Sequence, residues 1–145
     1  MKSRQMWVAM LLLVLSCVSN AQERPYRDGP VSVVTSVKVM DGQYENYMKF
    51  LASAWRGNMA ASKEAGVVLD YAVYNASPRR ADDPDIYLVT TYANMAAFDG
   101  MNEKMDPILA KTMKMNLGQR EEAAGKRTVM RTILGTEMLR VVDFK

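Results

Sequence analysis

A dense run of charged residues, PRRADDPD, occupies Pro78 to Asp85 between two segments that are typical of β-strands. Its three aspartates offer oxygens that suit Ca²⁺, but the spaced order D-x-D-x-D-G of an EF-hand loop is absent. Proline fixes φ and aspartate caps local N–H groups, so the same residues also suit a solvated turn. We expect a hairpin loop here, in preference to a dimer contact or to a binding or catalytic site.

Imidazole chemistry is excluded, because the sequence contains no histidine, and Cys17 is the only cysteine. Histidine-based catalytic triads, the usual zinc sites and a proximal histidine for haem are therefore not available. A single thiol also forms no intrachain disulfide. Thioethers favour Cu(I), but methionine at helical spacing more often fills an irregular core. We expect no metal and no cofactor, with the copper alternative resting on Met101, Met105, Met113 and Met115.

Aromatic side chains are the best material for a ligand pocket, and the candidates are Tyr44, Tyr47, Trp55, Tyr71 and Tyr92. Arg140, inside an otherwise apolar segment, offers a positive charge for an anionic group. Aromatic residues on amphipathic faces also build cores, and Arg140 equally suits an ion pair with Asp70 or a place at a sheet edge. The candidate ligand-binding residues are Trp55, Tyr71, Tyr92 and Arg140, and no catalytic residue is identified.

Residues 1–21 have the pattern of a signal peptide: a basic start, an apolar run over Met6 to Leu15, and small residues at Ser19 and Ala21. The apolar run is shorter than the roughly 20 residues of a membrane-spanning helix. We expect cleavage near Ala21 and a periplasmic or secreted protein. A competing interpretation treats the residues before Cys17 as a lipoprotein cleavage site, with the chain anchored through that cysteine.

Removal of residues 1–21 leaves 17 basic and 16 acidic residues, a net charge of +1 in place of +3. Nucleic-acid-binding domains usually carry a clear basic surplus. We therefore expect no nucleic-acid partner.

Hydrophobic periodicity predicts one domain over residues 31–145, preceded by a flexible tail at residues 22–30. Alternating residues predict four strands, at Val31–Met40, Val67–Tyr74, Ile86–Tyr92 and Glu137–Phe144. Spacings of three and four predict a helix from Gln43 to Ala65 that ends at Gly66, and a second helix capped by Asn94. Pro107 is expected to kink or restart the second helix. The charged stretch from Gln119 to Met130 is expected to be helical, with an interruption at Gly125 and an end to the region at Gly135.

The order β-α-β-β-α-β, with a helical insertion before the last strand, predicts an α+β fold of the ferredoxin-like type. Its antiparallel sheet carries helices on one face. The other face is partly apolar, and exposed apolar surface of this kind usually marks an interface. We expect a homodimer that packs two sheets face to face.

Four segments carry a resemblance to the dimeric α+β barrel superfamily: VKVMDGQYENYMKFL, KEAGVVLDYAVY, SPRRADDPDIYLVTTYANMAAFDG and RTILGTEMLRVVDFK. The chain resembles a branch of small exported bacterial proteins of unassigned function that are similar to antibiotic-biosynthesis-monooxygenase-like domains. The resemblance implies a cavity between the helices and the sheet of each subunit. A fold shared by so many chemistries does not select one of them.

Two functional hypotheses follow. The first is a periplasmic binding or structural module for a small apolar or aromatic ligand. The second is a cofactor-independent monooxygenase or isomerase with an aromatic-lined cavity. The lack of histidine and of any acid–base motif favours the first.

Export is testable on the full chain. Expressed in a bacterium and recovered from the periplasm, the protein is expected to begin at Gln22, which intact-mass spectrometry measures directly. A chain recovered uncleaved in the cytoplasm, or cleaved before Cys17 and carrying lipid, would contradict this expectation.

Overall fold

The structure is a computed structural model that describes residues 23–145. The expected signal peptide at residues 1–21, its alternative at Cys17 and the expected first residue Gln22 lie outside the described residues.

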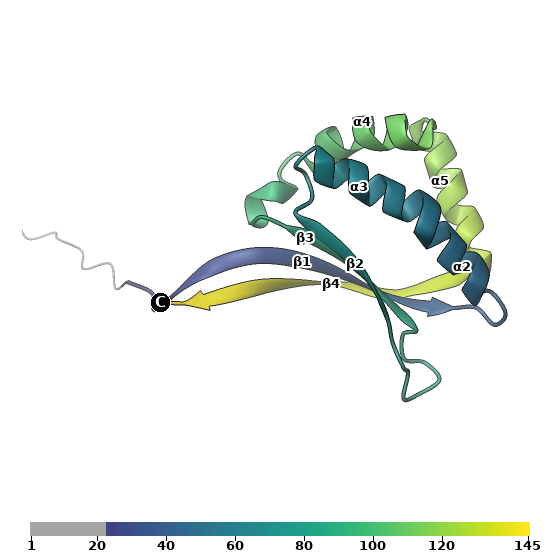
Figure 1. Ribbon diagram of the computed structural model, residues 1–145, viewed down its shortest axis with the longest axis horizontal. Coiled ribbons are helices and arrows are strands. Elements are labelled where there is room, and N and C mark those ends of the chain that lie inside the picture. Colours follow the sequence, from purple (N-terminus) through teal and green to yellow (C-terminus); the bar gives the residue numbers. More distant parts are fainter. Residues whose placement is uncertain (1–22) are drawn as a thin grey trace, which may run out of the picture.

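Four antiparallel strands form one sheet in the order β2-β3-β1-β4. They are β1 (Tyr26–Val39), β2 (Asp70–Asn75), β3 (Ile86–Tyr92) and β4 (Arg131–Phe144). All the helices lie on one face of this sheet (Figure 1). This is the ferredoxin-like α+β arrangement that the sequence predicts.

The helical layer consists of two runs of consecutive helices, the first and the second helical run. Between β1 and β2 the chain forms α2 (Tyr44–Phe50), the π-helical turn η2 (Leu51–Trp55) and α3 (Arg56–Glu64). Between β3 and β4 it forms η3 (Met95–Phe98), α4 (Met101–Met113), α5 (Leu117–Lys126) and η4 (Arg127–Val129). No helix in the described residues has the length and apolar character needed to cross a membrane.

The first strand begins at Tyr26, so the expected flexible tail is in large part strand. This outer part of β1 pairs with β4 alone, because pairing with β3 begins at Val31. A bulge between Asp28 and Val31 accommodates Pro30, whose missing N–H no third strand requires. At Gly29 a Cβ would lie 3.0 Å from the Val141 Cβ, so the glycine allows β1 to approach β4 closely. Gly29 and Pro30, which suggested a flexible tail, are therefore part of a strand pairing.

The ends of the helices follow the sequence only in part. Gly66 ends α3 as expected: its φ is +74°, its N–H donates to the Lys63 carbonyl, and the Val67 N–H donates to the Ser62 carbonyl. Asn94 does not cap a long helix. It precedes the short η3, and α4 starts only after Gly100, which has a φ of +60°.

The second run does not restart at Pro107 and is not interrupted at Gly125. The helix α4 continues across Pro107, and α5 continues across Gly125 to Lys126. The strand β4 also starts at Arg131, six residues before the expected Glu137, and passes through Gly135. A register shift beside Ser36 and Val37 inserts an extra residue into β4, which hides the alternation there.

The core lies where the first helical run crosses the central strands. Val37, Val39 and Ile86 of the sheet pack against Tyr47 and Leu51 of the helix, and none of the five exceeds 9% exposure. Burial of each such side chain contributes about 1.5–3 kcal/mol, so this cluster fixes the helix on the sheet.

The charged residues at Pro78 to Asp85 form the β2–β3 loop, which projects from the sheet away from the helices (Figure 1). The Asp83 carboxylate accepts from the N–H groups of Arg79 and Arg80, each at 3.0 Å. This is local turn capping of the kind the sequence predicts.

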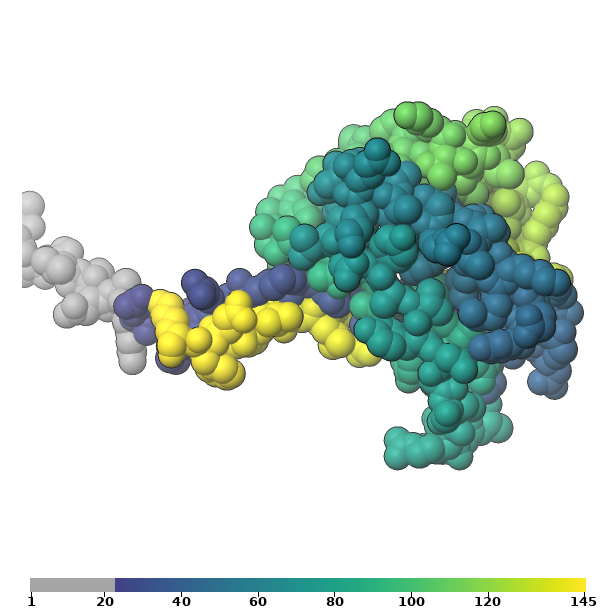
Figure 2. Space-filling view, viewed as in Figure 1, coloured from purple at the N-terminus to yellow at the C-terminus, as the bar shows by residue number. Residues whose placement is uncertain are grey.

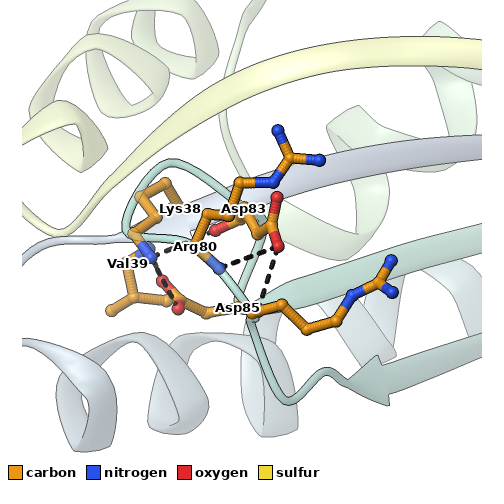
Figure 3. A network of polar contacts seen from close by, with 6 residues as sticks. Lys38, Val39, Arg80, Asp83 and Asp85 are labelled. Carbon is orange, nitrogen blue, oxygen red and sulfur yellow. Dashed lines mark hydrogen bonds and ion pairs between the residues drawn. The ribbon is translucent and has the colours of Figure 1, made fainter.

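Asp85, at the end of the loop, has a further role that the sequence does not show (Figure 3). Its carboxylate accepts from the Val39 N–H at 2.8 Å and from the Lys38 ammonium at 3.0 Å. Burial opposes ionisation of this carboxyl, but the two donors outweigh burial and lower its pKa. Asp85 therefore ties the start of β3 to the end of β1.

Asp85→Asn is expected to lower the free energy of unfolding by about 1–3 kcal/mol at pH 7, because it removes a charge-assisted hydrogen-bond acceptor. The folded-state pKa is depressed, so the contribution is present above the unfolded value of 3.8 and is lost as pH falls through the folded value. Urea unfolding should show the two proteins converging below about pH 4. Asp82→Asn, in the same loop, is the control. Equal stability of wild type and Asp85→Asn at pH 7 would contradict the role of Asp85.

Candidate functional site

An apolar cavity of about 270 Å³ lies between the first helical run and the edge strand β2. Helical residues form one wall and β2 forms the other. Ligand cavities in proteins start at roughly 300 Å³, and this cavity lies at that lower limit. Its volume therefore suits a small molecule of about one or two rings. The lining residues are Met48, Leu51, Ala52, Trp55, Arg56, Tyr71, Ala72 and Val73.

The π-helical turn η2 supplies three of the helical residues in this wall, Leu51, Ala52 and Trp55. Its wider turn is closed by the Arg56 N–H, which donates to the Leu51 carbonyl five residues earlier. Such insertions are rare in helices and frequent at functional sites. Leu51, at the start of this turn, is part of the core as well as of the lining. Trp55 and Arg56, at its end, lie beside the cavity.

Trp55 and Tyr71 meet at the cavity. Their rings are 5.6 Å apart at an interplanar angle of 82°, an edge-to-face contact. Aromatic pairs in this geometry stabilise a structure by about 0.5–1.5 kcal/mol beyond the area they bury. The structure thus brings together two of the four residues proposed from sequence, one from the helix and one from the sheet.

Arg56 is the only charged residue of the eight that line the cavity, and it is exposed. It provides one polar group at an otherwise apolar site, which is the composition that small-molecule sites favour. The same eight residues include no carboxylate. The arrangement can therefore hold an apolar ring and orient a polar substituent toward Arg56, but it provides no carboxylate base.

Tyr92 lies apart from this cavity and does not line it. Its ring packs against Phe98 with centroids 4.6 Å apart. Burial raises the pKa of Tyr92, and burial likewise raises that of Tyr47 despite the opposing effect of Arg131. Both phenols stay protonated at neutral pH, so neither acts as a ready-made base.

Arg140 also lies outside the cavity. It is on β4, the edge strand opposite β2, and its guanidinium donates to the Asp28 carboxylate at 2.9 Å. The expected place at a sheet edge is observed, but the expected ion pair of Arg140 with Asp70 is wrong. Its partner is Asp28, whereas Asp70 pairs with Lys63 at 2.8 Å.

The methionines occupy several environments. Met105 accepts a contact from the Ser62 hydroxyl at 3.6 Å, in the packing between α3 and α4. Met101 and Met113 are half-buried on α4, while Met115 lies beyond its end and is exposed. Met105 thus has the packing role that the sequence favours over copper.

Sequence reasoning missed several residues of the cavity. Met48, Leu51 and Trp55 follow the spacing of three and four that predicts one apolar face of the helix. For Met48 and Leu51 this spacing indicates a place in the core, but it does not indicate a cavity. No feature of the sequence pointed to Arg56 or Ala52. The sequence predicts a regular helix here, and a regular helix does not show where a π turn places these residues. Val73 lies in the strand predicted at Val67–Tyr74, but its role depends on β2 being an edge strand.

No family model matches the sequence, and no curated protein matches it. Among solved structures, HapK from Hahella chejuensis is 14% identical over 75% of this chain and 90% of its own, with a TM-score of 0.50. A dimeric protein of unknown function and ferredoxin-like fold from Bacteroides fragilis is 15% identical over 82% and 99%, with a TM-score of 0.46. PA3566 from Pseudomonas aeruginosa is 11% identical over 81% and 96%, also with a TM-score of 0.46.

At these identities a likeness concerns the fold alone. The likeness to HapK agrees with the strand order β2-β3-β1-β4 and with the helices on one face. The chain has the ferredoxin-like α+β fold.

Proposed function

We propose that the protein is a binding module for a small apolar or aromatic molecule. The observation that carries the proposal is the cavity between η2 and β2, with the Trp55–Tyr71 pair in its wall. Its apolar surface favours a ring, and Arg56 supplies one polar contact. The signal-peptide pattern at residues 1–21 supports a periplasmic or secreted location for this module.

Binding is favoured over catalysis by the groups around the cavity. General acid–base catalysis needs a group that gains or loses a proton near the operating pH. The lining offers the guanidinium of Arg56 and the phenol of Tyr71, and none of its residues carries a carboxylate. A cofactor-independent oxygenase or isomerase would have to rely on the reactivity of its own substrate.

Filling the cavity tests the proposal. Ala52→Phe adds a ring to the wall and is expected to weaken binding of a neutral aromatic probe, indole, by about tenfold or more, equivalent to about 1.4 kcal/mol. The measurement is an indole titration followed by the amide signals of Ala52, Trp55 and Tyr71 in NMR spectra. Ala60→Phe, on an exposed face of α3, is the matched control. No saturable shift of these signals in the wild type would contradict the proposal.

We also propose that the module is a homodimer, on the evidence of exposed apolar side chains along β4. The outer halves of β1 and β4 project beyond the helical layer (Figure 2). Single exposed apolar residues are ordinary, but a contiguous group on an edge strand usually marks an interface. The exposed group comprises Ile133, Leu134, Met138, Leu139, Val141, Val142 and Phe144, each 45–81% exposed.

Leu139 lies on the face of the sheet opposite the helices, because it pairs with Ser32, next to the helix-facing Val31. Leu139→Glu is expected to convert the dimer to a monomer, since a buried unpaired carboxylate costs several kcal/mol. Sedimentation velocity measures the change. Val129→Glu, at an exposed position of η4, should leave the dimer intact. A wild-type monomer at micromolar concentration would contradict the proposal.

A further inference from the structure

A second cavity, of about 350 Å³, lies within the helical layer between the first and second helical runs. Trp55 lines it as well as the first cavity, so one residue separates the two. Apolar side chains form much of its wall, including Phe50, Leu109 and Met113. Its volume falls in the range of small-molecule sites.

Three buried side-chain atoms without a hydrogen-bond partner belong to residues of this cavity. They are the Asn58 Oδ1, the Arg120 Nε and the Arg127 Nε, and they are all such atoms in the described residues. A buried polar group without a partner costs about 1–3 kcal/mol. All three belong to the lining of one cavity, so a ligand with matching polar groups would satisfy them at one place.

The Arg120 side chain is only 10% exposed. One terminal nitrogen donates to the Asp106 carboxylate at 2.8 Å, which balances its charge. This contact leaves the Nε–H without an acceptor. A nine-tenths-buried guanidinium thus retains one unused donor at the cavity.

Arg127 differs from Arg120, because no carboxylate pairs with it among the described residues. One terminal nitrogen donates to the Ala123 carbonyl at 3.1 Å, and the guanidinium lies 4.8 Å from the centre of the Phe50 ring. Burial, and after it the nearby Arg131, lowers the pKa of Arg127, while Tyr47 opposes this shift. The lining also includes the carboxylates of Asp106 and Glu121, and Arg127 is the arginine of this lining that has no carboxylate partner among the described residues.

We propose that this second cavity binds a small aromatic carboxylate that also carries a hydroxyl group. The carboxylate supplies the acceptors that the Nε–H groups of Arg120 and Arg127 lack, and it balances the charge of Arg127. The hydroxyl donates to the Asn58 Oδ1. The ring packs against the apolar wall beside Trp55.

The probe is 4-hydroxybenzoate, titrated calorimetrically into the full chain, with neutral 4-hydroxybenzamide as the comparison ligand. We expect saturable binding of the carboxylate and at least tenfold weaker binding of the amide. Arg127→Gln should weaken carboxylate binding at least tenfold, whereas Arg79→Gln, in the exposed β2–β3 loop, should not change it. No saturable binding, or an equal loss in both variants, overturns the proposal.

Asn58→Asp gives a second test that does not depend on the folding of Arg127→Gln. It places a carboxylate on the wall of the same cavity, where it competes for the arginines. We expect a higher melting temperature and at least tenfold weaker binding of 4-hydroxybenzoate. Unchanged affinity overturns the proposal. Arg127 and Asn58 do not line the first cavity, so failure here is distinguishable from failure of indole binding there.

Discussion

The packing of Tyr47 and Leu51 against Val37 and Ile86 is the contact on which the remaining structure depends. It fixes the first helical run over the two central strands. Because the sheet has only four strands, that helix then has an edge strand on one side and the second helical run on the other. Both cavities lie in these flanking spaces.

Trp55 connects the two spaces. It ends the π-helical turn η2, meets Tyr71 at the cavity beside β2 and also lines the cavity within the helical layer. The two sites differ in chemistry, since the first is apolar with one exposed arginine and the second has two partly buried arginines, two carboxylates and an amide. The two proposed sites therefore share one indole, that of Trp55, in their walls.

Periodicity was sufficient to predict the order of strands and helices along the chain and the main helix, because alternation and the spacing of Tyr47, Leu51 and Trp55 directly reflect burial. Periodicity failed where a bulge or a register shift interrupts the alternation of residues along a strand. The bulge at Gly29 and Pro30 conceals strand residues, and the register shift opposite Ser36 conceals the first part of β4. Asp85 was predicted as a turn residue, but its bonds to Lys38 and Val39 join segments far apart in the sequence.

The candidate site was predictable only as far as its aromatic residues. Trp55 and Tyr71 are large and rigid, so their placement on a helix face and a strand face points to a shared core or pocket. Arg56, Arg120 and Arg127 are ordinary charged residues of helical segments in the sequence. Their importance depends on which helices become neighbours, which local periodicity does not specify.

Native mass spectrometry of the protein purified from bacterial periplasm tests the binding function most directly. The expected result is a reproducible small-molecule mass on the wild-type protein that is lost from Ala52→Phe and retained by Ala60→Phe. A wild-type protein without bound mass, even after incubation with an excess of indole, would contradict a binding role for the cavity between η2 and β2.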